Sequence, residues 1–221
     1  MIEIEYVNAE IQYDQARIFR RLHIEPGTYV YEYCTENFPR LAEELQRRLR
    51  MTNCFCILNK PIPLGIEDID NCQKQVVCLA SCSSEILQAV EDLAAKGDFL
   101  ESYLLNDLAN EALFNASDQM NRQAEALVEA MGCHLTQRYS PGEGAVPIEL
   151  QKDLLECFRN DPALQHIHLT ESYMLAPEKF MLYIFGADPS KPKRSLEHDC
   201  SQCPNVNCFF RMEGASSYFC E

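Results

Sequence analysis

The chain has 221 residues, of which 47% are apolar, a composition that allows a packed core and excludes disorder along the whole chain. Its 34 acidic residues outnumber the 19 basic ones and give a net charge of −15. This balance argues against binding to nucleic acid or to an anionic membrane surface, because both need clustered Lys and Arg.

The first part of the chain is predicted to contain both strands and helices. Alternating apolar residues at the start and two short apolar runs further on indicate strands, whereas apolar residues at helical spacing indicate helices. The predicted elements are a strand over residues 2–7, a short helix over 15–22, an amphipathic helix over 40–51 and buried strands over 54–58 and 76–80.

The middle of the chain is predicted to be helical. Ser83 and Ser84 are suited to cap a helix that ends at Gly97. The next segment, 99–131, has no Pro or Gly and carries a broad apolar stripe before Gly132 ends it. We therefore expect it to be the central helix of the core.

The remainder is predicted to return to strands before its composition changes. The expected elements are a strand over 133–139, a turn over 140–144, a helix over 148–159 that Pro147 opens, and strands over 167–169 and 180–185. Strands that are not separated by regular helices favour an α+β fold with a mostly antiparallel sheet. Residues 189–221 are rich in Pro, Lys, Ser and Cys, so we expect a domain over 1–188 with an appended tail.

A turn with two glycines follows a predicted strand end at Arg138. Arg is the side chain best suited to hold a carboxylate through two parallel hydrogen bonds, and glycine lets a ligand approach the backbone. The run Arg138-Tyr-Ser-Pro-Gly-Glu-Gly could therefore hold a small ligand with a carboxylate. The alternative is a strand-to-helix connection with an exposed Arg.

Two motifs resemble those of a known family. The run from Arg138 to Lys152 resembles the S-adenosylmethionine-binding signature Arg-x-x-x-Gly-Tyr in the activation domain of cobalamin-dependent methionine synthase. About thirty residues on, the run from Leu169 to Pro177 resembles the second motif of that family, Leu-Thr-Glu-Ser followed by an apolar stretch and Pro. The resemblance covers roughly residues 70–187 and is closest to stand-alone members from anaerobes, here with a Cys-rich C-terminal tail.

The resemblance implies a fold, an activity and partners. The fold would be a C-shaped α+β domain with a twisted, mostly antiparallel sheet flanked by helices, one of them long and central. The activity would be reductive reactivation of a corrinoid protein or corrinoid-dependent methyltransferase, with S-adenosylmethionine as methyl donor and an electron donor such as flavodoxin or ferredoxin. The competing interpretation is a non-catalytic module that docks on a corrinoid protein.

The resemblance also implies which residues would contact the ligand, although it identifies no catalytic residue. Arg138 would take the ligand's carboxylate, and the backbone of the turn would line the site. The full set is Arg138, Pro141, Gly142, Glu143, Glu171, Ser172, Phe185 and Gly186.

Glu143 departs from the signature, which has Tyr at this position. A carboxylate cannot stack as a phenol ring does, so two arrangements are open. Glu143 could pair with the positive groups of the ligand, or it could turn to solvent and leave the pocket underfilled.

Cysteine is abundant, with 12 residues in the chain. The start of the chain lacks the features of a secretory signal, so we expect a cytoplasmic protein, in which metal-bound or buried thiols are favoured over disulfides. Cys200 and Cys203 have the Cys-x2-Cys spacing at which two thiolates can meet one metal ion. With Cys208 and Cys220 they could hold an iron–sulfur cluster or zinc; free thiols are the alternative.

Overall fold

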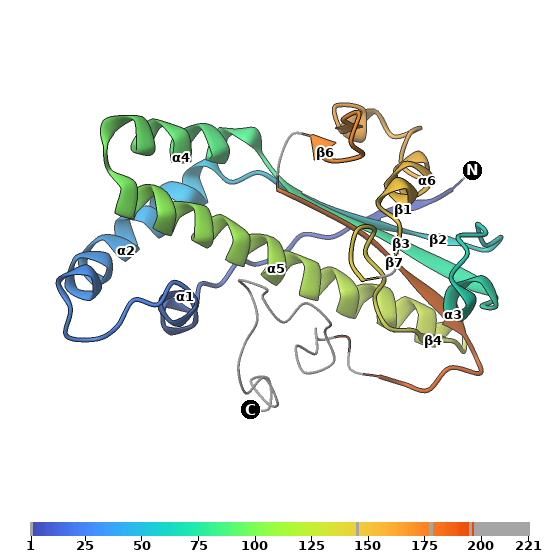
Figure 1. The fold of residues 1–221 in the computed structure, drawn as a ribbon. Coiled ribbons are helices and arrows are strands. Elements are labelled where there is room, and N and C mark those ends of the chain that lie inside the picture. Colours follow the sequence, from blue (N-terminus) through green and yellow to red (C-terminus); the bar gives the residue numbers. More distant parts are fainter. Residues whose placement is uncertain (1, 145, 177–178, 195, 197–221) are drawn as a thin grey trace.

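Five strands form the main sheet of the computed structural model, which describes residues 2–144, 146–176, 179–194 and 196 (Figure 1). Their order is β1-β2-β3-β7-β4, and every neighbouring pair is antiparallel. The strands are β1 (Ile4–Tyr6), β2 (Met51–Leu58), β3 (Lys74–Cys82), β7 (Phe180–Asp188) and β4 (His134–Leu135). At the centre of the sheet, Cys78 of β3 pairs with Phe55 of β2 on one side and with Tyr183 of β7 on the other. These three residues therefore form one row across the sheet.

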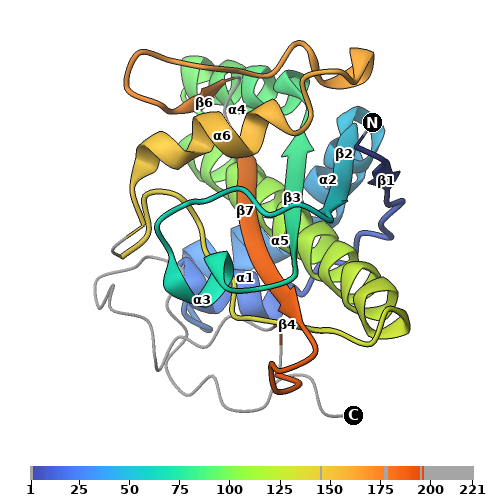
Figure 2. The same cartoon turned by 90° about the vertical axis from the view of Figure 1, so that its right-hand side faces the viewer.

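The two faces of this sheet pack against different elements, because successive residues of a strand point to opposite sides. On one side Phe55 and Tyr183 belong to a core with the helix α5 (Phe99–Ala130). On the other side Cys54 and Cys56 pack with the short elements seen in front of β3 and β7 in Figure 2. These elements are α3 (Glu67–Asp70), η1 (Ile148–Leu150), α6 (Gln151–Glu156) and η2 (Pro162–Leu164).

The helix α5 serves two cores. Its 32 residues make it about 48 Å long. The half nearer its C-terminus lies on the sheet, with Met120 and Ala124 in the sheet core. The half nearer its N-terminus, with Leu104 and Leu108, packs with α1 (Gln15–Arg21), α2 (Tyr29–Arg48) and α4 (Ser84–Lys96) (Figure 1).

The prediction of a long central helix is confirmed, as is the helix that Ser83 precedes and Gly97 ends. The predicted start of the 40–51 helix was wrong, since α2 already begins at Tyr29. The Thr28 side chain caps it by accepting a hydrogen bond from the Tyr31 amide. Pro39 costs the helix one hydrogen bond, and the burial of Cys34 and Phe38 before it offsets that loss.

Two further predicted elements were longer than those in the structure. The strand expected over 133–139 pairs only at β4 and through a single bridge from Tyr139 to Ile184. It is interrupted because the Thr136 hydroxyl, rather than a backbone carbonyl, accepts the Gly186 amide hydrogen bond at 2.9 Å. The helix expected over 148–159 breaks into η1 and α6, after which the Phe158 and Arg159 amides bond three residues back and tighten the chain into turns.

The eight cysteines within the described part of the chain are free and buried, as expected for core residues. Among the described helices, none is long and apolar enough to cross a membrane.

The first residues of the predicted tail pack back on the domain, where Lys193 pairs with Glu129 of α5 at 2.5 Å and Leu196 touches the sheet core. The four tail cysteines of the predicted metal site lie outside the described residues.

A buried ion network joins α1 to α5. The Arg21 guanidinium donates to Asp107 Oδ2 from Nε at 3.0 Å and to Glu111 Oε2 from Nη1 at 3.0 Å. All three side chains are at most 4% exposed. Arg17 lies 3.5 Å from Glu111 as well, so two arginines face two carboxylates. Loss of any one of these groups leaves a buried charge poorly compensated.

Removing Arg21 should therefore destabilise the protein strongly. We expect Arg21→Met to lower the free energy of unfolding by about 3–5 kcal/mol, because Asp107 stays buried without its cationic partner and Glu111 keeps only Arg17, at 3.5 Å. The matched control is Arg40→Met, which breaks the pair with Glu101 at an arginine whose side chain is 49% exposed, and should cost at most about 1 kcal/mol. Urea unfolding of both variants measures the difference, and equal losses would contradict this account.

Candidate functional site

The segment that carries Arg138 runs beside β7 without forming a regular strand. The Thr136 amide donates to the Gly186 carbonyl at 2.9 Å, and Tyr139 and Ile184 exchange two backbone hydrogen bonds of 2.9 Å. Gly186 allows this close approach, since a Cβ there would lie 2.6 Å from Cys72 Sγ and 3.0 Å from Thr136 Cγ2. The glycine predicted to contact a ligand is thus required for the packing of the segment.

Arg138 lies over the ring of Tyr183. Its guanidinium carbon is 5.4 Å from the ring centroid, a cation–π distance, and its side chain is 21% exposed. The Tyr183 ring is held in place by α5, because its hydroxyl is hydrogen-bonded to Ser117 at 2.8 Å and to Asn121 at 2.7 Å, both on that helix. The orientation of the Arg138 side chain therefore depends on a buried ring that α5 holds.

The turn after Arg138 closes on itself. The Glu143 amide donates to the Ser140 carbonyl at 3.0 Å, and the Gly142 amide donates to the Val146 carbonyl at 2.9 Å. Gly142 has φ +87°, a conformation that favours glycine, and a Cβ there would meet Ile148 Cδ1 at 2.8 Å. The amides of Gly142 and Glu143 are thus used within the turn itself.

Glu143 lies beside an arginine of its own chain, and the two arrangements considered from the sequence remain predictions. Its carboxylate lies 3.8 Å from the Arg138 guanidinium, and its side chain is 60% exposed. The predicted ligand-binding arginine is thus paired with a carboxylate of its own chain. At this exposure the pair is weak and screened by solvent.

The other predicted residues lie in three settings. Pro141 adjoins Gly142 in the turn, and Phe185 is fully buried in the sheet core with its ring edge-on to Tyr183 at 5.7 Å. Glu171 and Ser172 are exposed in the turn between β5 (His168–Leu169) and β6 (Leu175–Ala176), which form a separate two-stranded sheet. The structure thus brings Arg138 and Glu143 into contact and places the second motif on its own hairpin.

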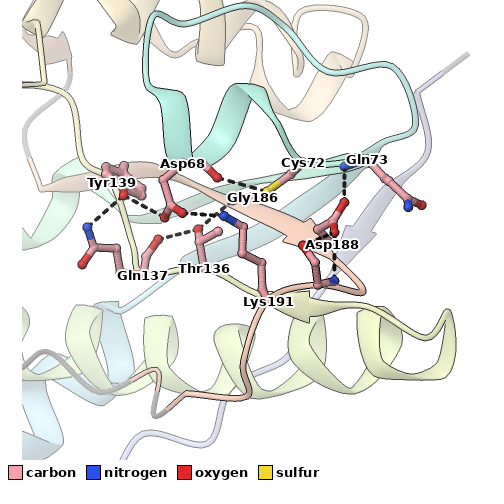
Figure 3. Close-up of polar contacts among 10 residues, drawn as sticks. Asp68, Cys72, Gln73, Thr136, Gln137, Tyr139, Gly186, Asp188 and Lys191 are labelled. Carbon is pink, nitrogen blue, oxygen red and sulfur yellow. Dashed lines mark hydrogen bonds and ion pairs between the residues drawn. The ribbon is translucent and has the colours of Figure 1, made fainter.

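A polar network that was missed from the sequence anchors the segment on the opposite face of the sheet (Figure 3). The Tyr139 hydroxyl donates to Asp68 Oδ2 at 2.9 Å and accepts from Gln137 at 2.8 Å. Lys191 donates to Asp68 Oδ1 at 2.6 Å. Asp68, on α3, thereby holds both the residue next to Arg138 and the segment after β7. No sequence signal joins residues so far apart in the chain.

Asp68 ionises more readily than an ordinary aspartate. Burial alone would raise the pKa of Asp68, but the hydrogen bonds from Lys191 and Tyr139 outweigh it and lower the pKa below its usual value. Next to this network, Asp188 accepts hydrogen bonds from the Ser190 side chain and amide, and these lower its pKa as well. Carboxylates here act as anchors for the chain.

Comparisons with known proteins bear on the fold. No protein-family model matches the chain, and no curated protein matches its sequence. Among solved structures, it is similar to a crystal structure of the MetH reactivation domain bound to AdoHcy (S-adenosylhomocysteine), with a TM-score of 0.56 and 12% identity over 90% of this chain and 82% of that chain. At this identity the likeness shows the fold alone, and it confirms the predicted α+β class with its antiparallel sheet and long helix.

The anchoring role of Asp68 predicts a pH dependence of stability. Because its pKa is lowered in the folded state, its contribution is complete above about pH 4, the ordinary value, and is lost as the pH falls through the lower folded-state value. We expect Asp68→Asn to destabilise the protein at pH 7 by at most about 1 kcal/mol, since the side chain is 38% exposed. The gap to wild type should narrow below about pH 4.

Thermal unfolding of both proteins between pH 2.5 and 7 would measure this gap. Lys191→Met serves as the control, because combining it with Asp68→Asn should add little to the loss from either change alone. A gap that stays constant across this pH range would show that Asp68 acts through its shape rather than its charge.

Proposed function

We propose that this chain binds S-adenosylmethionine through Arg138 and takes part in the reductive reactivation of a corrinoid protein. The observation that carries the proposal is the placement of Arg138. Its guanidinium is held on the Tyr183 ring, partly open to solvent, beside a glycine-containing turn. The fold, which is similar to that of a reactivation domain solved with AdoHcy, and the order of the two sequence motifs support the same function.

The ligand's charges suit the surroundings proposed for it. The carboxylate of S-adenosylmethionine matches the two-pronged donor of Arg138. Its sulfonium and amino groups are positive, and the chain has a net charge of −15. In the proposed reaction a reduced cobalt on the partner takes the methyl group: the sulfur–methyl bond breaks, a cobalt–carbon bond forms, and S-adenosylhomocysteine is released. The part of this chain would be to hold the methyl donor and to exclude water.

The electron for this reaction would come from a partner protein or through the Cys-rich tail. Reduction of the cobalt by one electron needs a donor, for which a flavodoxin or ferredoxin is suited. An iron–sulfur cluster on Cys200, Cys203, Cys208 and Cys220 remains our hypothesis for a local relay, with zinc as its structural alternative. Among the described residues, no group of three or more potential ligands could hold a metal ion.

One observation favours the second candidate, a docking module without methyl transfer. Glu143 already lies 3.8 Å from Arg138, where it competes with the carboxylate of a ligand. If a ligand does not displace Glu143, Arg138 is not available to bind it. The chain would then bind a corrinoid protein without transferring a methyl group.

The role of Arg138 can be tested by calorimetry with S-adenosylhomocysteine. We expect Arg138→Ala to weaken binding by about 1.5–3 kcal/mol, the range for a hydrogen bond to a charged group. We expect Glu143→Gln to strengthen binding by about twofold to fivefold, because it removes a competing surface carboxylate. Arg159→Ala is the matched control, since Arg159 is exposed and pairs only with the neighbouring Glu156 in the structure described.

Two results would contradict this assignment. If the wild-type protein binds neither S-adenosylmethionine nor S-adenosylhomocysteine, the docking module is the better account. Weaker binding by Glu143→Gln would contradict the expected competition between Glu143 and the ligand's carboxylate. It would mean instead that Glu143 pairs with the positive groups of the ligand, which is the first of the two arrangements considered from the sequence.

The reaction itself can be tested with a corrinoid protein in its oxidised, inactive state. With a one-electron donor and S-adenosylmethionine carrying a labelled methyl group, we expect the label to appear on the corrinoid only when this chain is present. Arg138→Ala should reduce the rate at limiting methyl donor. A stable complex with the corrinoid protein and no transfer of label would instead support the docking module.

A further inference from the structure

An apolar groove lies at the end of the molecule farther from β4, between the loop after α1 and the starts of α2 and α5 (Figure 1). Its apolar lining comes from Leu22, Ile24 and Val30 on the side of the loop and α2, and from Leu100, Tyr103 and Leu104 on α5. The volume of the groove is about 270 Å³. Small-molecule sites usually enclose about 300–1,000 Å³, so this groove is better suited to single side chains of a protein partner.

The walls of the groove are held in place. The Ile24 amide donates to the Phe19 carbonyl at 2.8 Å, and the Thr28 hydroxyl donates to the Glu25 carbonyl at 2.7 Å, so the loop is tied down at both ends. At the start of α5, Glu101 accepts a hydrogen bond of 2.8 Å from the Tyr33 hydroxyl on α2. The groove is therefore formed before any partner binds.

Three aromatic side chains are exposed around the groove. Tyr29, Phe99 and Tyr103 are the most exposed of the large apolar side chains that the structure describes, at 75%, 70% and 57%. Tyr103 lines the groove, Phe99 precedes Leu100, and the Tyr29 ring lies 6.2 Å from that of Tyr33. Apolar residues that are exposed together, rather than singly, mark interaction surfaces, and Tyr and Phe are enriched in protein–protein interfaces.

The charges along the walls of the groove have one sign. Residues 22–32 and 98–104, which carry the walls, include no Lys or Arg and four acidic residues: Glu25, Glu32, Asp98 and Glu101. Arg40 on α2 compensates Glu101, so the excess of negative charge comes from the other three. The exposed rings favour the same kind of partner, because a Lys or Arg can lie over the face of an aromatic ring. A basic partner is therefore attracted to this surface and an acidic one is repelled.

We propose that this groove binds an amphipathic helix of a partner protein, with basic residues on either side of its apolar face. A groove between helices accepts the apolar side chains that such a helix presents at positions i, i+3 or i+4, and i+7. None of the residues that line the groove belongs to a strand of the described structure, so a partner segment cannot bind here by extending the sheet. The basic residues of the helix would face the carboxylates and the aromatic rings at the rim.

This surface is separate from the Arg138 site. Leu100 in the groove and Ser117, which holds the Tyr183 ring, are both on α5 and lie about 26 Å apart along its axis. Binding of a methyl donor at Arg138 needs no residue of the groove. The inference thus goes beyond the proposed function and does not rest on it.

The proposal can be tested with a helical peptide of Leu and Lys that has Leu along one face, and with the same peptide carrying Glu in place of Lys. Fluorescence anisotropy with the full chain measures the affinity of each. We expect the Lys peptide to bind at least about tenfold more tightly than the Glu peptide, and its affinity to fall as salt is added. Leu100→Ser should weaken its binding by about tenfold. Leu127→Ser is the matched control, since Leu127 is on the same helix and is 36% exposed against 41% for Leu100, and it should leave binding unchanged.

Photo-cross-linking from benzoylphenylalanine in place of Phe99 identifies what covers the surface. We expect a cross-link to the Lys peptide. A cross-link to a second copy of the chain, in a dimer that Leu100→Ser dissociates, would overturn the proposal and make this surface a dimer interface. A cross-link to residues 197–221 of the same chain would overturn it as well, since the tail would then occupy the groove. Equal affinity for the two peptides, or equal losses in Leu100→Ser and Leu127→Ser, would show that the groove does not select a basic helix.

Discussion

The hydroxyl of Tyr183 makes the contact on which the candidate site depends. Buried between β7 and α5, it is bonded to Ser117 and Asn121, and this fixes the ring that lies beneath Arg138. A tyrosine hydroxyl can be buried at this depth only because both partners are present. The same two bonds set the position of α5 over the sheet, so the geometry of the site and the packing of the core share one cause.

The helix α5 carries that contact to the other end of the molecule. Its C-terminal half lies on the sheet, and its N-terminal half is bound to α1 through the Arg21 network. Because a single continuous helix takes part in both cores, a change in either core can shift the residues that hold Tyr183. The loop with Arg138 is anchored from the opposite face as well, by Asp68 and its bonds to Tyr139 and Lys191.

Apolar patterns in the sequence were sufficient to predict the main elements of the core. The strands around Phe55 and Cys78, which are buried on both faces, were found as short apolar runs, and the long helix was found by its apolar stripe. Such patterns were insufficient where a side chain replaces a backbone partner, as Thr136 does, or where tertiary burial outweighs a proline in α2. The site was predicted in part: the motif led to Arg138, but pairings between residues far apart in the chain, such as Asp68 with Lys191, leave no local pattern.

The central claim is that Arg138 holds the carboxylate of an S-adenosyl ligand. The most direct measurement compares the affinities of S-adenosylhomocysteine and its decarboxylated analogue in the wild type and in Arg138→Ala. If Arg138 binds the carboxylate, removing that group weakens binding to the wild type and has little effect on the variant, since the two changes delete the same interaction. The same loss of affinity in both proteins would show that the carboxylate binds elsewhere and would contradict the account.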